Sequence, residues 1–434
     1  MAESQICLKS ELDLFALPPT QMSVFDTQDI EYQPLTGLTD EGPVEFFISG
    51  EGERYIDLTK LKCHIKCKIV KKDGTDLTDA DFVVPESNLL HNIFGQIDVT
   101  ANDKLITPST NTYSYTAFLD TLFTYSEDAG NSHLQSQFWY KDNNRYMDQT
   151  NETENKPMAK RLNKAKNSKT IDMLGTLHLD LAKQERLLPN NVSLKIRMVR
   201  NSNMFCLRTK KEDTTEYKIH LIDVSLFVRK VEINDKIREA HENNFKHGNM
   251  QFPLRRTVTK VFTESANALQ TSKENLYLGQ LPNRIVVGLL DHKAYYGHPH
   301  YNPFNFQHFY TKYIALQVNG KSVPGKPYTP NFDNGAYIRS YIGMKEALGL
   351  NDSIHSNNIN YEDFGKGSTL WVFDLTPDGD PDGSHLNPIK HGNIRLELHF
   401  ARPLAKAITV LVQGEFQNVL EIDQHRNVVV DFAN

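Results

Sequence analysis

The stretch that decides the fold is Ile97-Asp-Val-Thr-Ala-Asn102-Asp-Lys104-Leu-Ile106, because the second half of the chain repeats it as Ile314-Ala-Leu-Gln-Val-Asn319-Gly-Lys321-Ser-Val323. Two further segments recur in the same order: residues 187–198 as 388–400, and residues 224–233 as 414–422. The spacing between the copies shrinks along the chain. Unequal surface loops in a duplicated fold give such a drift, because loops tolerate insertions better than core strands do. The sequence therefore predicts two copies of one fold in tandem.

Around these repeats, apolar and polar residues alternate in short runs. Residues 61–69, 192–198 and 394–400 each alternate throughout, as expected of strands with one face on a core and one toward solvent. Asn319-Gly320 lies between two apolar runs and predicts a two-residue hairpin. Many short strands separated by Gly, Pro and Asn favour antiparallel sandwiches over a parallel sheet. The pattern predicts two β-sandwiches.

Helices are expected to be few and short. We predict one over residues 113–125, its counterpart over 336–348, and a linker helix over 235–244. Residues 126–169 and 349–366 are predicted loops that follow the first two helices. The first contains a basic run, residues 160–169, which could be a nuclear-import signal or a phosphate patch; a solvated loop is the plainer interpretation.

Length and charge limit the classes of protein to consider. The 434 residues fit two domains. We place an N-terminal arm at 1–40, a first domain at 41–234, a linker at 235–248 and a second domain at 249–434. The net charge of −6 argues against strong direct nucleic-acid binding. No apolar run is long enough for a membrane span, and charges near the start argue against a secretory leader.

The sequence holds only weak metal candidates. Asp378, Asp380 and Asp382 begin like a calcium loop, but Ile389 stands where a bidentate Glu is required. His298 and His300 lack a nearby carboxylate, which leaves a metal site incomplete. Cys63 and Cys67 are too far apart along one strand for a disulfide and are expected to be small buried hydrophobes. No metal or cofactor is predicted.

No nucleophile elbow, phosphate loop or zinc-protease motif occurs in the sequence, so we expect no catalytic residues and no enzyme. Aromatic residues are abundant in the predicted loops. They suggest contact surfaces for partners, or else seals at the ends of the sandwiches within one chain. The interface candidates are Phe138, Trp139, Tyr140, Tyr295, Tyr296 and Phe304.

Several phrases between residue 40 and the C-terminus are distinctive. They include Asn88-Leu-Leu-His-Asn-Ile-Phe94, Gln137-Phe-Trp-Tyr-Lys-Asp142, Asn302-Pro-Phe-Asn-Phe306, Phe373-Asp-Leu-Thr-Pro377 and Asn418-Val-Leu-Glu-Ile-Asp423. In these phrases the chain resembles the hexon-like, double-jelly-roll major capsid proteins of Polinton (Maverick) elements and adintoviruses, which are related to those of other large and mid-sized DNA viruses.

The resemblance implies an all-β chain of two tandem eight-stranded jelly rolls with short helices in the loops. It implies a structural major capsid protein whose homotrimers form pseudo-hexagonal capsomers that tile an icosahedral shell. Its partners would be neighbouring capsomers and penton or minor capsid proteins. The protein would be made in the cytoplasm, assembled there or in the nucleus, and located in the virion.

Two other functions stay open. A minor or penton-type capsid protein is usually built from one jelly roll, so the internal repeat argues against it. A carbohydrate-binding or carbohydrate-processing tandem β-sandwich is the alternative from a different class, and sugar binding by the isolated chain would support it.

Overall fold

The computed structural model describes residues 10–12, 14–15, 17–107 and 110–430. The first half forms two four-stranded antiparallel sheets, with the orders β1-β10-β3-β7 and β2-β8-β5-β6. Their strands are β1 Val24–Tyr32, β2 Val44–Ile48, β3 Tyr55–Lys71, β5 Phe94–Ala101, β6 Lys104–Leu105, β7 Ile171–Thr176, β8 Leu194–Arg200 and β10 Tyr217–Ile233. Two short strands, β4 Val83–Pro85 and β9 Leu207–Thr209, pair with each other outside these sheets.

The second half forms two sheets of the same kind. Their orders are β11-β18-β13-β16, with β19 beside β18, and β12-β17-β14-β15. The strands are β11 Met250–Glu264, β12 Gln270–Lys273, β13 Arg284–Asp291, β14 Thr311–Val318, β15 Lys321–Tyr328, β16 Leu370–Asp374, β17 Ile394–Phe400, β18 Ile408–Ile422 and β19 Val428–Val430.

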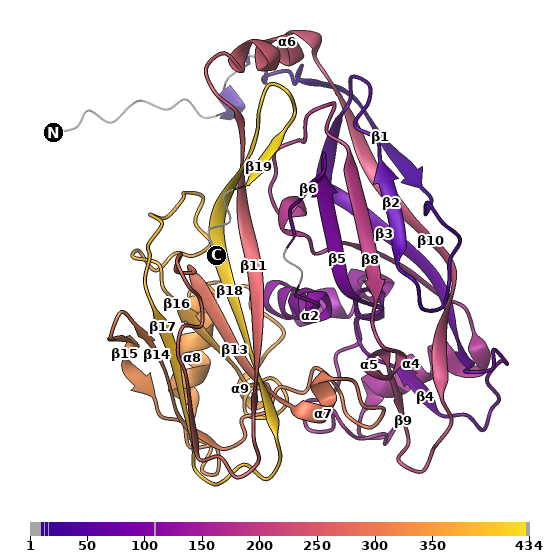
Figure 1. Cartoon of the computed structure of the whole chain (residues 1–434), viewed down its shortest axis with the longest axis vertical. Coiled ribbons are helices and arrows are strands. Elements are labelled where there is room, and N and C mark those ends of the chain that lie inside the picture. The colour runs from indigo at the N-terminus through magenta and orange to yellow at the C-terminus, as the bar shows by residue number, and fades with distance from the viewer. Residues whose placement is uncertain (1–9, 13, 16, 108–109, 431–434) are drawn as a thin grey trace.

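Both halves connect their strands in the same way. In the first half β1 lies beside β10 and β2 lies beside β8. In the second half β11 lies beside β18 and β12 lies beside β17, in the same order along the chain. This is the order of a jelly roll, so the predicted fold of two tandem eight-stranded jelly rolls is confirmed. In Figure 1 the first jelly roll, coloured indigo to magenta, stands beside the second, coloured orange to yellow.

The repeated stretch, residues 97–106 and 314–323, forms the same turn in both jelly rolls. In the first, the Asn102 N–H donates to the Ser193 carbonyl at 3.1 Å, and the Ser193 N–H donates to Asn102 Oδ1 at 2.8 Å. In the second, Asn319 and Asn393 make the same pair of bonds at 3.0 and 2.9 Å. Both turn asparagines have a positive φ, 40° and 49°, which asparagine tolerates better than most residues. The duplication therefore extends to individual hydrogen bonds.

The predicted alternation is confirmed in β3, where apolar side chains point into the core. Cys63 and Cys67 are fully buried there, and burial raises the pKa of each thiol to about 12. A thiol with so high a pKa is a poor nucleophile and metal ligand, so these cysteines act as small hydrophobes, as predicted.

The helices are short and lie in the connections between strands. They are α1 Leu89–Asn92, α2 Tyr113–Thr124, α3 Glu127–Gly130, α4 Lys156–Ala165, α5 Asn203–Cys206, α6 Asp235–Asn244, α7 His292–Tyr295, α8 Ile338–Ala347 and α9 Tyr361–Phe364. Turns of 3-10 helix are η1 Ser10–Leu12, η2 His133–Gln137, η3 Lys166–Ser168 and η4 Asp180–Ala182. The predicted counterparts α2 and α8 occupy the same place in the two jelly rolls, and α6 is the predicted helix between them.

The interpretation of residues 160–169 as a solvated loop is wrong. Most of the run belongs to α4, whose apolar face packs on β4 through a small cluster containing Phe82, Val84, Met158 and Leu162. Arg161, within the basic run, is fully buried. The sequence shows that this run is basic, but it does not show that the Arg161 side chain points inward.

The expectation that strands begin only after residue 40 is also wrong. β1 pairs with β10 along Val24–Tyr32 and is the first strand of the first jelly roll. It lies at the edge of its sheet and most of its side chains are exposed, so its sequence shows no alternation. The other boundaries of the arm, the two domains and the linker stay predictions.

One hydrophobic core runs through both jelly rolls. A single cluster of buried side chains includes Ile65 and Phe118 of the first half together with Phe304 and Trp371 of the second. Within the described part of the chain, no helix combines the length and the apolar character needed to cross a bilayer.

Candidate functional site

The aromatic residues predicted as interface candidates lie mostly at the junction between the two jelly rolls. Phe138, Trp139, Tyr140 and Phe304 are buried within the chain. Tyr295 is partly buried against the same core, and Tyr296 is 66% exposed. The alternative interpretation, that these rings seal the sandwiches within one chain, fits the burial of the first four. Tyr295 and Tyr296 keep exposed surface, and their role at an interface stays a prediction.

Stacked rings join the halves. Phe118 of α2 lies parallel to Phe304 with the ring centroids 4.1 Å apart, and Tyr115 stacks on Tyr295 at 5.5 Å. Phe205 meets the edge of Phe304 at 5.7 Å. Aromatic pairs at such distances add about 0.5–1.5 kcal/mol each beyond the area that they bury. The junction is therefore packed like a core rather than like a loose contact between domains.

The first jelly roll also contains a buried ionic cluster. Its members are Glu86, Asp142, Arg161 and Arg208, whose side chains are at most 1% exposed. Arg161 Nη2 donates to Asp142 Oδ1 at 2.8 Å, and Arg208 Nη2 donates to Glu86 Oε2 at 3.0 Å. Arg208 also reaches Asp142 at 3.2 Å, so the four charges form one network.

The network sets the protonation of its carboxyl groups. Burial raises the pKa of Glu86 above its ordinary value, against the opposing effect of Arg208 and Arg161. Burial also opposes ionisation of Asp142, but the two arginines outweigh it and lower the pKa of that carboxyl. Asp142 is thus the charged partner of both guanidinium groups.

The second half docks onto this cluster through the phrase Asn302-Pro-Phe-Asn-Phe306. Asn302 Nδ2 donates to Asp142 Oδ2 at 2.8 Å, and the Asn302 N–H donates to Asp148 Oδ1 at 2.8 Å. Asn305 Nδ2 donates to Asp148 Oδ2 at 2.7 Å. The two phenylalanines of the phrase, Phe304 and Phe306, are buried beside it. A distinctive phrase of the sequence therefore joins the jelly rolls.

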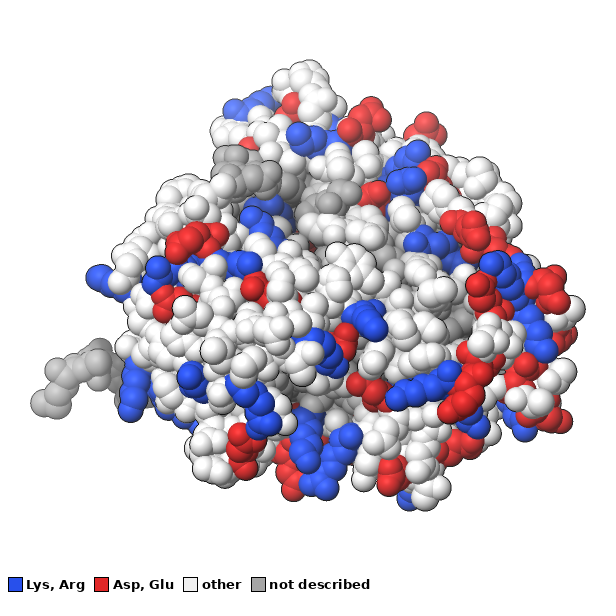
Figure 2. All heavy atoms as spheres, turned by 60° about the horizontal axis from the view of Figure 1, so that its bottom comes forward, with Lys and Arg blue, Asp and Glu red and all other residues white. Residues whose placement is uncertain are grey.

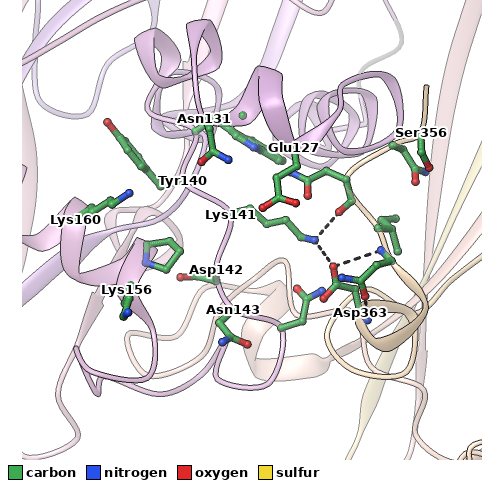
Figure 3. A pocket seen from close by; sticks show the side chains of 18 of the residues that line it. Glu127, Asn131, Tyr140, Lys141, Asp142, Asn143, Lys156, Lys160, Ser356 and Asp363 are labelled. Carbon is green, nitrogen blue, oxygen red and sulfur yellow. Dashed lines mark hydrogen bonds and ion pairs between the residues drawn. The ribbon is translucent and has the colours of Figure 1, made fainter. Parts of the chain in front are cut away.

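A cavity of about 760 Å³, lined by polar and aromatic side chains, opens on the same junction (Figure 3). Residues 127–160 of the first half and residues 341–363 of the second form its walls. Lys141 reaches across: its Nζ donates to the Asn358 carbonyl at 2.5 Å and to Asp363 Oδ2 at 2.8 Å, as the dashed lines in Figure 3 show. Asp363 closes the capping box of α9 with Asn360, which fixes its carboxylate.

Two of the three calcium candidates, Asp378 and Asp382, are engaged otherwise. Asp382 binds Arg255 and Arg284, and Asp378 Oδ2 lies 2.6 Å from His385 Nε2. In the described residues, no three His, Cys, Asp or Glu side chains are gathered so that they could hold a metal ion, at this turn or at His298 and His300. The turn is therefore built from ion pairs.

Charges of both signs are mixed over the end of the molecule away from α6. Figure 2 shows lysine and arginine interspersed with aspartate and glutamate on that face. Such a surface lacks the extended basic field with which proteins attract nucleic acid.

Sequence reasoning missed the ionic cluster. The available signal was a single charge inside an apolar stretch: Arg208 follows Phe205-Cys-Leu207, and Glu86 follows Val83-Val-Pro85. Charged residues are almost never fully buried unless paired, so two such positions would have predicted a buried pair.

Comparison with known proteins gives the fold. No model of a known protein family matches the chain. An uncharacterized protein of Caenorhabditis elegans is 22% identical over 426 residues, which cover 96% of this chain and 99% of the worm protein.

Solved structures similar to the chain come from viruses. A chain of the Sputnik virophage matches with a TM-score of 0.64 and 10% identity, over 99% of this chain and 93% of that one. The faustovirus major capsid protein matches with a TM-score of 0.62 and 8% identity, over 94% and 92%. The chain has the fold of viral double-jelly-roll capsid proteins. The mavirus major capsid protein agrees, with a TM-score of 0.53 and 9% identity, over 99% and 96%.

Proposed function

We propose that the protein is a structural major capsid protein and has no enzymatic activity. The observation that carries this proposal is the pair of jelly rolls with the same strand order, matched over nearly the whole chain by viral major capsid proteins. A rigid junction supports it, because two jelly rolls fixed side by side make one stiff building block.

The block would act as a homotrimer. Three copies of two similar jelly rolls give a pseudo-hexagonal capsomer, the shape that tiles an icosahedral shell beside neighbouring capsomers and penton or minor capsid proteins. Interfaces of about 2,000 Å² or more would be ordinary for such an obligate assembly. Tyr296 and Ile354, which are 66% and 96% exposed, are candidates for these contacts.

The N-terminal arm would bind a neighbouring subunit. Leu14, Phe15 and Leu17 are 77%, 100% and 92% exposed, which is unfavourable for large apolar side chains in a row. An apolar cavity of about 500 Å³ lies near the start of β1 and is lined by residues that include Tyr55, Ile237 and Phe252. We propose that this cavity of one subunit receives the arm of another.

The source would be a Polinton (Maverick) element or an adintovirus. The resemblance of the sequence phrases supports this origin, and the full-length relative in an animal is consistent with an element resident in animal genomes. The protein would then be made in the cytoplasm and located in the virion, without strong direct binding to nucleic acid.

The first experiment is the absolute mass of the purified chain by light scattering after size-exclusion chromatography. We expect a value near three times 49.7 kDa, and hexagonal particles by electron microscopy. A stable monomer at micromolar concentration would contradict the homotrimer. Deletion of residues 1–17 should leave the trimer intact and weaken the association of trimers with one another.

A further inference from the structure

The cavity between the jelly rolls has the size of a ligand site. Its volume of about 760 Å³ falls within the range of roughly 300–1,000 Å³ that small-molecule sites occupy. Its walls come from α3, the start of α4, α8 and the segment before α9, so it exists only because the two halves are fixed together.

Several polar side chains of the wall have no partner among the described residues. Lys156 and Lys160, one turn apart on α4, make no ion pair there, and neither do Glu127 and Glu154. The side chains of Asn131 and Asn358 make no hydrogen bond to another described residue. These side chains are open to solvent, so the wall presents hydrogen-bonding groups that no other side chain uses.

The unpaired lysine, glutamate and asparagine side chains indicate which class of ligand the cavity can bind. The two free ammonium groups are balanced by two free carboxylates, so a phosphate or another anion would meet repulsion as well as attraction. An apolar ligand would bury these charges and amides without partners, which is costly. A ligand rich in hydroxyl groups can donate to carboxylates and accept from ammonium and amide N–H groups at once.

We propose that this cavity binds a neutral oligosaccharide. Glu127 and Glu154 accept hydrogen bonds from sugar hydroxyls, Lys156 and Lys160 donate to sugar oxygens, and the amides of Asn131 and Asn358 do both. The ion pair between Lys141 and Asp363 holds the two walls at a fixed separation (Figure 3). The site needs no assembly with other subunits, so it stands or falls separately from the capsid function.

The test is binding of the intact chain to a glycan microarray and, for a set of neutral oligosaccharides at millimolar concentration, saturation-transfer NMR. We expect one or more neutral oligosaccharides to bind and to be retained better than sulfated or sialylated ones. No binding in either assay overturns the proposal, and binding confined to anionic glycans overturns the assigned ligand class.

Two variants locate the site. Asn131 is exposed beside the cavity, so Asn131→Trp should obstruct the mouth and weaken binding at least about tenfold without unfolding the chain. Asn163→Trp places the same side chain on an exposed position of α4 that does not line the cavity, and should bind like the unaltered chain. Binding that survives Asn131→Trp places the sugar elsewhere and overturns the proposal. Circular dichroism of both variants checks the fold.

Discussion

The two jelly rolls share one framework but fill the space beside it with different chemistry. Strand order and the paired asparagine turn are the same in both. The first jelly roll buries a network of four charges, centred on Asp142. In the second, Phe364 of α9 lies edge-on to Trp371 of β16, with the ring centroids 6.3 Å apart. The comparison teaches that alternation in the strands fixes the frame, while the connections are free to pack with either ions or rings.

Removal of the shared carboxylate should have the largest effect on this difference. Asp142→Ala leaves Arg161 and Arg208 buried without their common partner, and we expect a loss of about 3–5 kcal/mol in the free energy of unfolding. Urea denaturation followed by fluorescence measures it.

The matched control is Asp128→Ala, an exposed aspartate of α3, which should change the free energy of unfolding by less than about 0.5 kcal/mol. A loss at Asp142 no larger than at Asp128 would mean that the network contributes nothing to stability, and the contrast between the jelly rolls would then be one of composition only.

Acid should weaken both jelly rolls through one histidine each, located between their third and fourth strands. Burial, reinforced by His178, keeps the pKa of His91 well below its ordinary value of 6.5. Tyr113 and Gln137 contact its ring, and Asp120 acts in the opposite direction. In the second jelly roll, burial lowers the pKa of His308 to about 4.

The direction follows from proton binding. Below about pH 6.5 both histidines are protonated in the unfolded chain and neutral in the folded chain. The free energy of unfolding therefore decreases as the pH is lowered, by up to about 1.4 kcal/mol per pH unit for each histidine. When the pH is lowered from about 6.5 to about 5, His91→Gln and His308→Gln should each lose about 2 kcal/mol less of the free energy of unfolding than the unaltered chain does. Urea denaturation at both pH values measures it, and an unchanged pH dependence in His91→Gln would show that this ring is not buried in its neutral form.

The smallest effect on stability is expected at the asparagine turn that the two jelly rolls share. Asn102→Ala and Asn319→Ala should each cost about 1–2 kcal/mol, because each loses a side-chain hydrogen bond and because alanine tolerates a positive φ less well than asparagine does. The cost should be greater at Asn102, whose Nδ2 also donates to the carbonyls of Asn191 and Arg426. Thermal denaturation compares the two variants.

Glycine separates the two contributions. Glycine adopts a positive φ without strain, so Asn102→Gly and Asn319→Gly lose only the side-chain hydrogen bonds. Each should therefore reduce stability less than the alanine variant does. Equal losses for alanine and glycine would show that backbone conformation does not matter at these turns.

Much of the framework could be predicted because its signals are local. Alternation predicts β3, β8 and β17, Asn319-Gly320 predicts the hairpin of β14 and β15, and the repeats align equivalent strands of the two jelly rolls. Caps and apolar spacing predict α2, α6 and α8 to within a residue or two, but they miss α4, which is as long as α6 and α8 and lies in a predicted loop.

The junction could not be predicted because its partners lie far apart in the sequence. Nothing local in Phe138-Trp-Tyr140 distinguishes a ring that contacts a second subunit from one that contacts the other half of its own chain. Arg161 looks like its neighbours in a basic run, yet it alone points at Asp142. The edge strand β1 has almost no buried side chains, so the sequence pattern that reports burial is absent there.

The pairing of β1 with β10 has a consequence for synthesis on the ribosome. Val24 lies opposite Ile233, so the first strand waits for roughly 200 residues, or roughly 10–40 s at common elongation rates, before its partner emerges. Throughout that time it is an unpaired edge, the kind of segment that joins foreign strands. Asp26, Asp29 and Glu31 place three negative charges along it, and charge of this kind discourages such mispairing. The polarity that hid β1 from sequence analysis is therefore what protects the nascent chain until the first jelly roll can close.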